Sequence, residues 1–277
     1  MDQAMKLPPE KKKSGLETMF FRSIWISDVH LGMRHAQVDA LLDFLRRSEC
    51  QNLYIVGDLI DGWQLKHKWF WRDEYNILIQ KLLRKSRHRT QITYITGNHD
   101  EFLENFGELN LGSLKLAQQA VHIGADGKRY LVIHGHQCDG LAHFNRLLDH
   151  VGARIYNGLL YLNSYSNRIR RMFGFGYWSL AAYLKSKAKS AVNVASDFER
   201  VLAQMARNEK ADGVICGHIH RAEIRDVDGI LYMNCGDWVE SCTALVEDMD
   251  GKFRLLHLRE DQAAKRDLTD KSHNKLQ

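Results

Sequence analysis

The chain has 277 residues, of which 44% are hydrophobic and 26% are charged, and its formal net charge is +5. This balance excludes a mainly disordered chain, because the apolar content is enough for one sizeable core. We find no apolar run long enough to cross a bilayer and no leader of signal-peptide type, so we expect a cytoplasmic protein.

The chain is expected to begin and end in flexible segments. Residues 1–18 contain both prolines of the chain and the run Lys11 to Lys13, with few apolar residues, which predicts a flexible basic tail. The folded domain is predicted over residues 19–260. It begins with a buried strand at residues 20–27, because that run is rich in large apolar residues. Residues 261–277 are expected to form a flexible C-terminal tail.

Helices and strands alternate in the first hundred residues. A helix is predicted over residues 36–47, because Val38, Leu41, Leu42 and Leu45 follow helical spacing. A second helix is predicted over residues 75–85. The further strands are expected at residues 53–56, 92–96, 121–123, 130–134, 213–216, 222–227, 230–234, 241–247 and 252–257.

Three Asp-Gly pairs predict tight hairpin turns in the second half of the chain. They lie at residues 126–127, 228–229 and 250–251. Alternating strands and helices followed by hairpins predict an α/β fold, a sandwich of mixed β-sheets flanked by helices.

Residues 137–190 differ in composition from their surroundings. They carry eight basic and two acidic residues together with nine aromatic ones, so their net charge exceeds that of the whole chain. We expect an inserted helical lid beside the functional site, and a packed helical hairpin with a solvated basic face is the alternative. Lys185 and Lys189 are four residues apart and share one helical face, which makes them candidates for binding substrate phosphate.

Five short polar motifs each follow a predicted strand. They are Asp28-Val29-His30, Gly57-Asp58, Gly97-Asn98-His99-Asp100, His134-Gly135-His136 and Gly217-His218-Ile219-His220. No motif is specific alone, since a single His-x-His is more often a chance pair. Strand ends in an α/β sheet meet in one crevice, however, so the five together predict one metal site. Carboxylates, imidazoles and an amide suit divalent Mn, Fe or Zn, and the absence of a CxxC motif disfavours a thiolate zinc site.

The order of these motifs resembles the pattern of the calcineurin-like metallophosphoesterase superfamily, which runs D-x-H, G-D, G-N-H-D/E, H and G-H-x-H. The match extends from Ile24 to His220, and residues 234–237 (Asn-Cys-Gly-Asp) close it. The resemblance implies the fold of that superfamily, with residues 137–190 as an inserted lid. It also implies a metal-dependent hydrolase that acts on phosphoester or phosphoanhydride bonds.

The resemblance further implies a pair of divalent ions, for which Mn²⁺ is our first choice and Fe or Zn the alternatives. Asp28, His30 and His220 would hold one ion, Asn98, His134 and His218 would hold the second, and Asp58 would bridge both. His99 would be a catalytic residue that does not bind metal and that protonates the leaving oxygen or stabilises its charge. Asp100 would orient the His99 imidazole. For His136 we favour a contact with His134 over the role of a loop residue.

Within the superfamily, the layout looks like the branch of UDP-2,3-diacylglucosamine hydrolases, which cleave a nucleotide-linked acylated sugar to UMP and a lipid 1-phosphate in lipid A synthesis. The similar stretches are residues 27–32 (SDVHLG), 57–63 (GDLIDGW), 98–103 (NHDEFL), 217–221 (GHIHR) and 236–238 (GDW), with the insertion after His134. Established enzymes of that branch carry Arg at the position of His99 and H-G-D in place of H-G-H. A related but distinct subfamily therefore stays open. The substrate class implies peripheral contact with the cytoplasmic face of the inner membrane.

Three other functions stay open at this point. A generic phosphodiesterase or phosphatase would keep the metals and lose the lipid. A nucleic-acid-binding protein or nuclease could use the basic lid, but the charge is modest and no nucleic-acid-binding module is present, so we do not expect nucleic acid as a partner. A catalytically inactive scaffold is disfavoured because every expected ligand is present.

Overall fold

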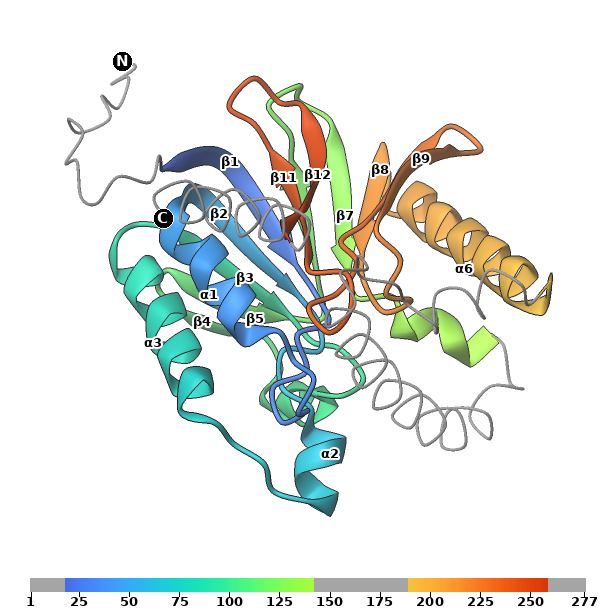
Figure 1. The fold of residues 1–277 in the computed structure, drawn as a ribbon. Helices are drawn as coiled ribbons and strands as arrows, with labels where there is room; N and C mark the ends of the chain where they lie inside the picture. Colours follow the sequence, from blue (N-terminus) through green and yellow to red (C-terminus); the bar gives the residue numbers. More distant parts are fainter. Residues whose placement is uncertain (1–17, 142–188, 259–277) are drawn as a thin grey trace, which may run out of the picture.

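The computed structural model describes residues 18–141 and 189–258, with side chains for residues 18–138 and 198–258. Two β-sheets pack face to face and helices cover their outer faces (Figure 1). One sheet has seven strands in the order β12-β11-β1-β2-β3-β5-β4, and the other has five in the order β6-β7-β8-β10-β9. The predicted α/β sandwich of mixed sheets is therefore confirmed.

The seven-stranded sheet has a parallel centre. β1 (Met19–Ile26), β2 (Ser48–Val56), β3 (Gln91–Ile95) and β5 (Leu114–Ala117) run parallel. The antiparallel strands at its edges are β4 (Leu109–Leu111), β11 (Thr243–Glu247) and β12 (Phe253–His257). On its outer face, α1 (Val38–Arg47) and α3 (Asp73–Arg87) form a core with alternate residues of β1 and β2.

The five-stranded sheet repeats this plan on a smaller scale. β7 (Arg129–Ile133), β8 (Gly213–Cys216) and β10 (Ile230–Asn234) are parallel, while β6 (Gln119–Ile123) and β9 (Glu223–Val227) pair antiparallel at the edges. α6 (Lys189–Asn208) covers the outer face with buried Leu202, Ala203 and Ala206. A third core fills the space between the sheets, where Trp25 stacks on Tyr54 with ring centroids 5.3 Å apart.

Most predicted elements are present, and the missed ones are short or close to the insertion. The three Asp-Gly pairs lie in hairpins, and at 228–229 both residues have positive φ, as a tight hairpin turn requires. The elements that the sequence did not predict are α2 (Gly62–His67), the 3₁₀ helices η1 (Glu101–Phe106) and η2 (His136–Leu141), β4, β5 and α6. No helix in the described ranges is both long and apolar enough to span a bilayer.

Several predictions concern residues that the structure does not describe. The two tails lie almost entirely in residues 1–17 and 259–277, and most of the predicted lid lies in residues 142–188. Lys185 is within that range. Lys189 is the first residue of α6, but its side chain is outside the described part.

The parallel strands bring the loops at their carboxyl ends together. The amide of Asp28 donates to the carbonyl of Gly57 at 3.2 Å, and that of Gly217 donates to the carbonyl of His134 at 3.1 Å. The two sheets are joined where the amide of Trp238 donates to the carbonyl of Asp28 at 3.0 Å. Every motif that the sequence singled out therefore lies at this end of the sandwich.

A buried carboxylate links the sheets toward the opposite end of β1. Glu247 is fully buried and pairs with Arg22 at 2.8 Å and with His122 Nε2 at 2.9 Å, and it accepts a hydrogen bond from the amide of Ala125 at 2.8 Å. Burial alone would raise the pKa of Glu247. The three partners outweigh burial and lower this pKa from 4.5 to about 2.

We expect Glu247→Gln to lower the free energy of unfolding at pH 7 by about 2–3 kcal/mol, because the ionised carboxylate holds both sheets. Since the folded-state pKa is depressed, this stabilisation is present above pH 4.5 and is lost as the pH falls toward 2. Urea unfolding at pH 7, 5 and 3 measures it, with exposed Glu209→Gln as the control. A difference that stays constant over this pH range would contradict the assignment.

Candidate metal centre

Strain of the backbone is concentrated at the predicted ligands. Nine non-glycine residues in the described part have positive φ, and five of them are predicted metal ligands: Asp28, His30, Asp58, His218 and His220, with φ between 53° and 69°. Such a conformation is uncommon for residues with a side chain and is kept where the surrounding structure enforces it, often at functional sites. The loops thus aim these side chains into one place.

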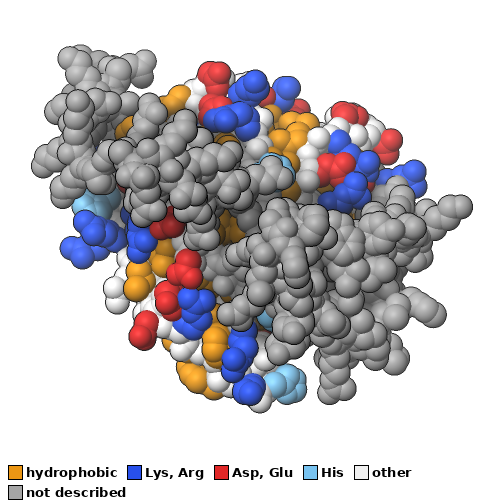
Figure 2. All heavy atoms as spheres, viewed as in Figure 1, with side chains coloured by type: hydrophobic (Ala, Val, Ile, Leu, Met, Phe, Trp, Pro, Cys, Tyr) orange, Lys and Arg blue, Asp and Glu red, His pale blue; other side chains and the backbone are white. Residues whose placement is uncertain are grey.

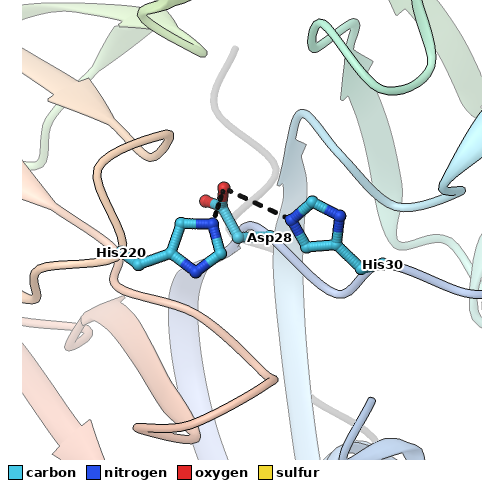
Figure 3. Close-up of side chains that lie close together, drawn as sticks. All are labelled: Asp28, His30 and His220. Carbon is cyan, nitrogen blue, oxygen red and sulfur yellow. Dashed lines mark ion pairs between the residues drawn. The ribbon is translucent and has the colours of Figure 1, made fainter. Parts of the chain in front are cut away.

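Asp28 lies between two histidines. Its Oδ1 is 3.2 Å from His220 Nε2 and 4.0 Å from His30 Nε2, and Figure 3 shows the two rings on either side of the carboxylate. All three residues offer a ligand atom within 4.8 Å of the others. The other carboxylate oxygen, Oδ2, accepts a hydrogen bond from the His218 amide at 3.0 Å. The structure therefore brings together the three residues that the sequence assigns to one ion.

Asp58 lies between the two groups of predicted ligands. Its Oδ2 is 3.8 Å from His30 Nε2 and 3.3 Å from His134 Nε2, while its Oδ1 accepts a hydrogen bond from the His99 amide at 2.9 Å. Asp58 forms one group of close ligand atoms with Asp28 and His134 and another with His30 and His99. This is the position that a bridging carboxylate requires.

The remaining predicted ligands surround His134. The carbonyl of Val56 can only accept, so His134 Nδ1 donates to it at 2.8 Å and the lone pair of Nε2 faces Asp58. The ring of His218 is next to that of His134, with centroids 5.2 Å apart. His218 is nevertheless outside the three groups of close ligand atoms.

Buried polar atoms show that these residues fit a pair of cations. Asp28 Oδ1, His30 Nε2, Asn98 Oδ1 and His134 Nε2 are buried and have no hydrogen-bond partner in the described part. Each such atom costs about 1–3 kcal/mol when it is left unsatisfied, and coordination to a cation removes that cost. The oxygen and imidazole donors are those that Mn, Fe and Zn accept.

The carboxylates and imidazoles shift one another's pKa values. Burial alone would raise the pKa of Asp28, but His220 lowers it to about 2, and His134 similarly holds the pKa of Asp58 well below 3.8. Burial would lower the pKa of His134, yet Asp58 raises it to about 10. Protons therefore compete with cations for these nitrogens, and cation binding should release protons.

A residue that the sequence analysis did not assign, Asp61, contacts both His30 and His99. Its Oδ2 is 3.3 Å from His30 Nδ1 and its Oδ1 is 3.1 Å from His99 Nδ1. Burial would raise the pKa of Asp61, but hydrogen bonds with the two histidines lower it. Asp61 also caps α2 by accepting from the Gln64 amide at 2.7 Å. Its ionised carboxylate can hold both rings in one orientation.

The role predicted for Asp100 has to be corrected. Its Oδ2 accepts hydrogen bonds from the Leu59 amide at 2.9 Å and the Tyr94 hydroxyl at 2.5 Å, and its Oδ1 accepts from the Gly97 amide at 2.5 Å. The carboxylate beside the His99 ring is that of Asp61 instead. Asp100 therefore braces the two loops, because it is buried beneath them.

The ring of His99 is enclosed by aromatic neighbours. Its centroid is 4.6 Å from that of His30, with the planes perpendicular, and 4.2 Å from that of Trp63. The ring of His136 is 5.5 Å from that of His134, and its Nε2 is 3.8 Å from Glu104 Oε1. His136 therefore lies beside a predicted ligand, as the sequence favoured.

Known proteins share this sequence pattern. A family model described as "Calcineurin-like phosphoesterase" matches residues 21–222. The "UDP-2,3-diacylglucosamine hydrolase" of Blochmanniella pennsylvanica is 27% identical over 74% of this chain and 81% of its own. Proteins of the same name are 25% identical in Psychromonas ingrahamii, over 85% of this chain and 96% of theirs, and 27% identical in Neisseria meningitidis, over 82% and 94%.

Solved structures show a lower similarity, on which no argument depends. A Vps29 mutant from Entamoeba histolytica aligns with 16% identity and a TM-score of 0.39, over 84% of this chain and 96% of that one. An archaeal phosphodiesterase aligns with 13% identity and the same TM-score, over 84% and 98%.

We expect Asp58→Asn to reduce the metal content from two divalent ions per chain to one or none, because the substitution removes the charge that faces both groups. Elemental analysis after dialysis against Mn²⁺ measures the content, and Asp43→Asn on exposed α1 is the control. Retention of two ions in Asp58→Asn would contradict the bridging role. Full activity of chelator-treated protein would contradict the metal centre itself.

We expect Asp61→Asn to lower kcat on a chromogenic phosphodiester by roughly 10- to 100-fold with two ions still bound, because the amide no longer fixes the His99 ring. Steady-state kinetics and elemental analysis of the same sample measure both quantities. His99→Ala should lose activity in the same way and keep its metals. If the double variant lost the product of the two single effects, Asp61 and His99 would act independently and the assignment would be wrong.

Proposed function

We propose a lipid-linked nucleotide as the substrate of this chain, which belongs to the calcineurin-like phosphoesterase family and is a metal-dependent hydrolase of phosphoester bonds. The reaction would cleave the pyrophosphate of UDP-2,3-diacylglucosamine to UMP and the lipid 1-phosphate. The names of relatives that match along most of their length support this substrate. The observation that carries the reaction class is the carboxylate of Asp58 between two groups of buried, unsatisfied ligand atoms.

Two divalent ions, with Mn²⁺ as our first choice, would be held by the residues around Asp58. Asp28, His30 and His220 would bind one ion and Asn98, His134 and His218 the other. When bound, such a pair neutralises the phosphate oxygens and supplies a nucleophilic water at neutral pH. The protein fixes the positions of these ligands through the strained loops described above.

His99 would handle the proton of the leaving group. Asp61 accepts the hydrogen of His99 Nδ1, so the proton that His99 can give is the one on Nε2. The ionised Asp61 stabilises the positive charge of the ring before that proton leaves. Trp63 covers the ring and restricts its motion. Donation of the proton to the leaving oxygen would then need no rearrangement of the site.

One observation favours a second candidate, a phosphodiesterase or phosphatase with a simpler substrate. An ester that leaves as an alkoxide needs protonation more than a pyrophosphate that leaves as a phosphate. The pairing of His99 with a buried carboxylate suits such an ester. The predicted lid, with Lys185 and Lys189, would favour the lipid substrate instead, and the nuclease alternative depends on the same residues.

A lipid-linked substrate would also place the protein at the cytoplasmic face of the inner membrane by peripheral contact. The acyl chains of such a molecule stay in a bilayer, so the enzyme has to meet its pyrophosphate at the surface. Nothing in this requirement calls for a spanning segment.

We expect Mn²⁺-loaded protein to hydrolyse UDP-2,3-diacylglucosamine with a kcat/KM at least ~100-fold above that for bis(p-nitrophenyl) phosphate, because remote binding energy is used for orientation. Mass spectrometry should detect UMP and the lipid 1-phosphate. Asp58→Asn controls for a contaminating hydrolase. Cleavage of the simple diester alone would refute the lipid substrate and keep the phosphoesterase.

A further inference from the structure

An exposed aromatic and basic surface lies where α2 ends. We define the α2–α3 surface as Arg34, Lys66, Lys68, Trp69 and Trp71. Trp69 is 73% exposed, more than any other large hydrophobic side chain in the described ranges. Figure 2 shows orange hydrophobic side chains beside blue Lys and Arg side chains and a pale-blue His at the lower end of the molecule, where α2 ends in Figure 1.

The exposed ring of Trp69 is held by its neighbours. It stacks on Trp71, with ring centroids 5.9 Å apart and planes 25° from parallel. Trp71 in turn donates its indole N–H to Asn76 Oδ1 at 2.9 Å and contacts the buried Tyr75 edge to face. Trp69 therefore presents a fixed apolar face to the solvent, and burying it elsewhere would cost little further conformational entropy.

The cations around Trp69 are available for an external partner. Lys66, Lys68 and Arg34 are exposed, and no acidic side chain in the described part forms an ion pair with them. The Arg34 guanidinium lies 4.8 Å above the ring of Phe70, which keeps it beside the aromatic segment. The surface therefore carries unbalanced positive charge next to an exposed indole.

The neighbouring acidic groups do not neutralise this charge. Arg72 already pairs with Asp39 at 3.1 Å and with Glu74 at 3.0 Å. Asp73 is the only acidic residue between positions 66 and 73, a stretch that also contains Lys66, Lys68 and Arg72. Asp73 begins α3, where the helix N-terminus stabilises its carboxylate.

We propose that the α2–α3 surface docks on the headgroup region of a bilayer that contains anionic phospholipids. Tryptophan is enriched at the boundary between headgroups and acyl chains, and Lys and Arg beside it bind lipid phosphates through their long side chains. A protein partner is disfavoured, since lysine is depleted at the centre of protein interfaces. The inference rests on the proposed function in one respect, because a lipid-linked substrate gives the reason for such a contact.

Vesicle flotation with the full chain tests the proposal. Wild-type protein should bind vesicles of 70% phosphatidylcholine and 30% phosphatidylglycerol and bind pure phosphatidylcholine at least tenfold more weakly. Trp69→Ala should weaken binding to the anionic vesicles by about tenfold. The double variant K66E/K68E should weaken it by about 25-fold or more, at about fivefold for each lost cation, and remove the preference for the anionic lipid.

The control is Phe106→Ala, because Phe106 is 65% exposed but follows the acidic residues Glu101 and Glu104 in η1. It should change vesicle binding by less than twofold. Turnover of a soluble phosphodiester should be unchanged in all variants, which shows that they are folded. The proposal is overturned if wild type binds neither vesicle, if it binds both equally, or if Phe106→Ala weakens binding as much as Trp69→Ala.

Two further readouts distinguish a bilayer contact from self-association and from a failure of the proposed substrate. Light scattering should give the same mass for wild type and Trp69→Ala, because a change would mean that the surface joins two copies of the chain instead. Vesicle binding is measured without substrate. Failure to cleave UDP-2,3-diacylglucosamine would therefore defeat the proposed substrate and leave the vesicle result standing, and the converse also holds.

Discussion

Two buried carboxylates that share one pocket impose the main constraint on this structure. Asp28 and Asp58 are almost completely inaccessible to solvent, and each raises the pKa of the other while histidines lower it. Removing a carboxylate from water is costly unless positive charge or hydrogen-bond donors replace the lost hydration. The carboxyl ends of both sheets have to deliver those groups, so the loops there adopt conformations that the same residues would avoid elsewhere.

Glycine makes that convergence possible at Gly97. A Cβ atom there would meet Asp58 Oδ1 and the amide of Asp58. Only a residue without a side chain lets the loop after β3 pass this close to the bridging position, and the next residue is the predicted ligand Asn98. The amide of Gly97 also donates to Asp100, which fixes the loop from the other side. The spacing of the motif thus reflects steric limits as well as chemistry.

The sequence predicts the positions of the ligands better than their partners. Periodicity and the polar motifs after strands place Asp28, Asp58 and His134 correctly, because the ends of parallel strands meet whatever the details of the loops. The partner of His99 depends on the path of a loop, which periodicity does not describe. Asp100 is adjacent in sequence but turns toward Tyr94, whereas Asp61 reaches His99 from the start of α2. A six-residue helix is too short for a pattern search to detect.

That short helix connects the chemistry with the outer surface. Its N-cap, Asp61, contacts His30 and His99, and its last residue, His67, is two positions before Trp69. Six residues rise by about 9 Å, so the α2–α3 surface and the candidate metal centre lie at the two ends of one rigid turn-and-a-half. The pyrophosphate of a lipid-linked nucleotide sits in the headgroup layer, close to the depth at which an interfacial tryptophan rests. A surface tied this closely to the catalytic carboxylates would fix the height of the site above the bilayer, and a loop in place of α2 would not.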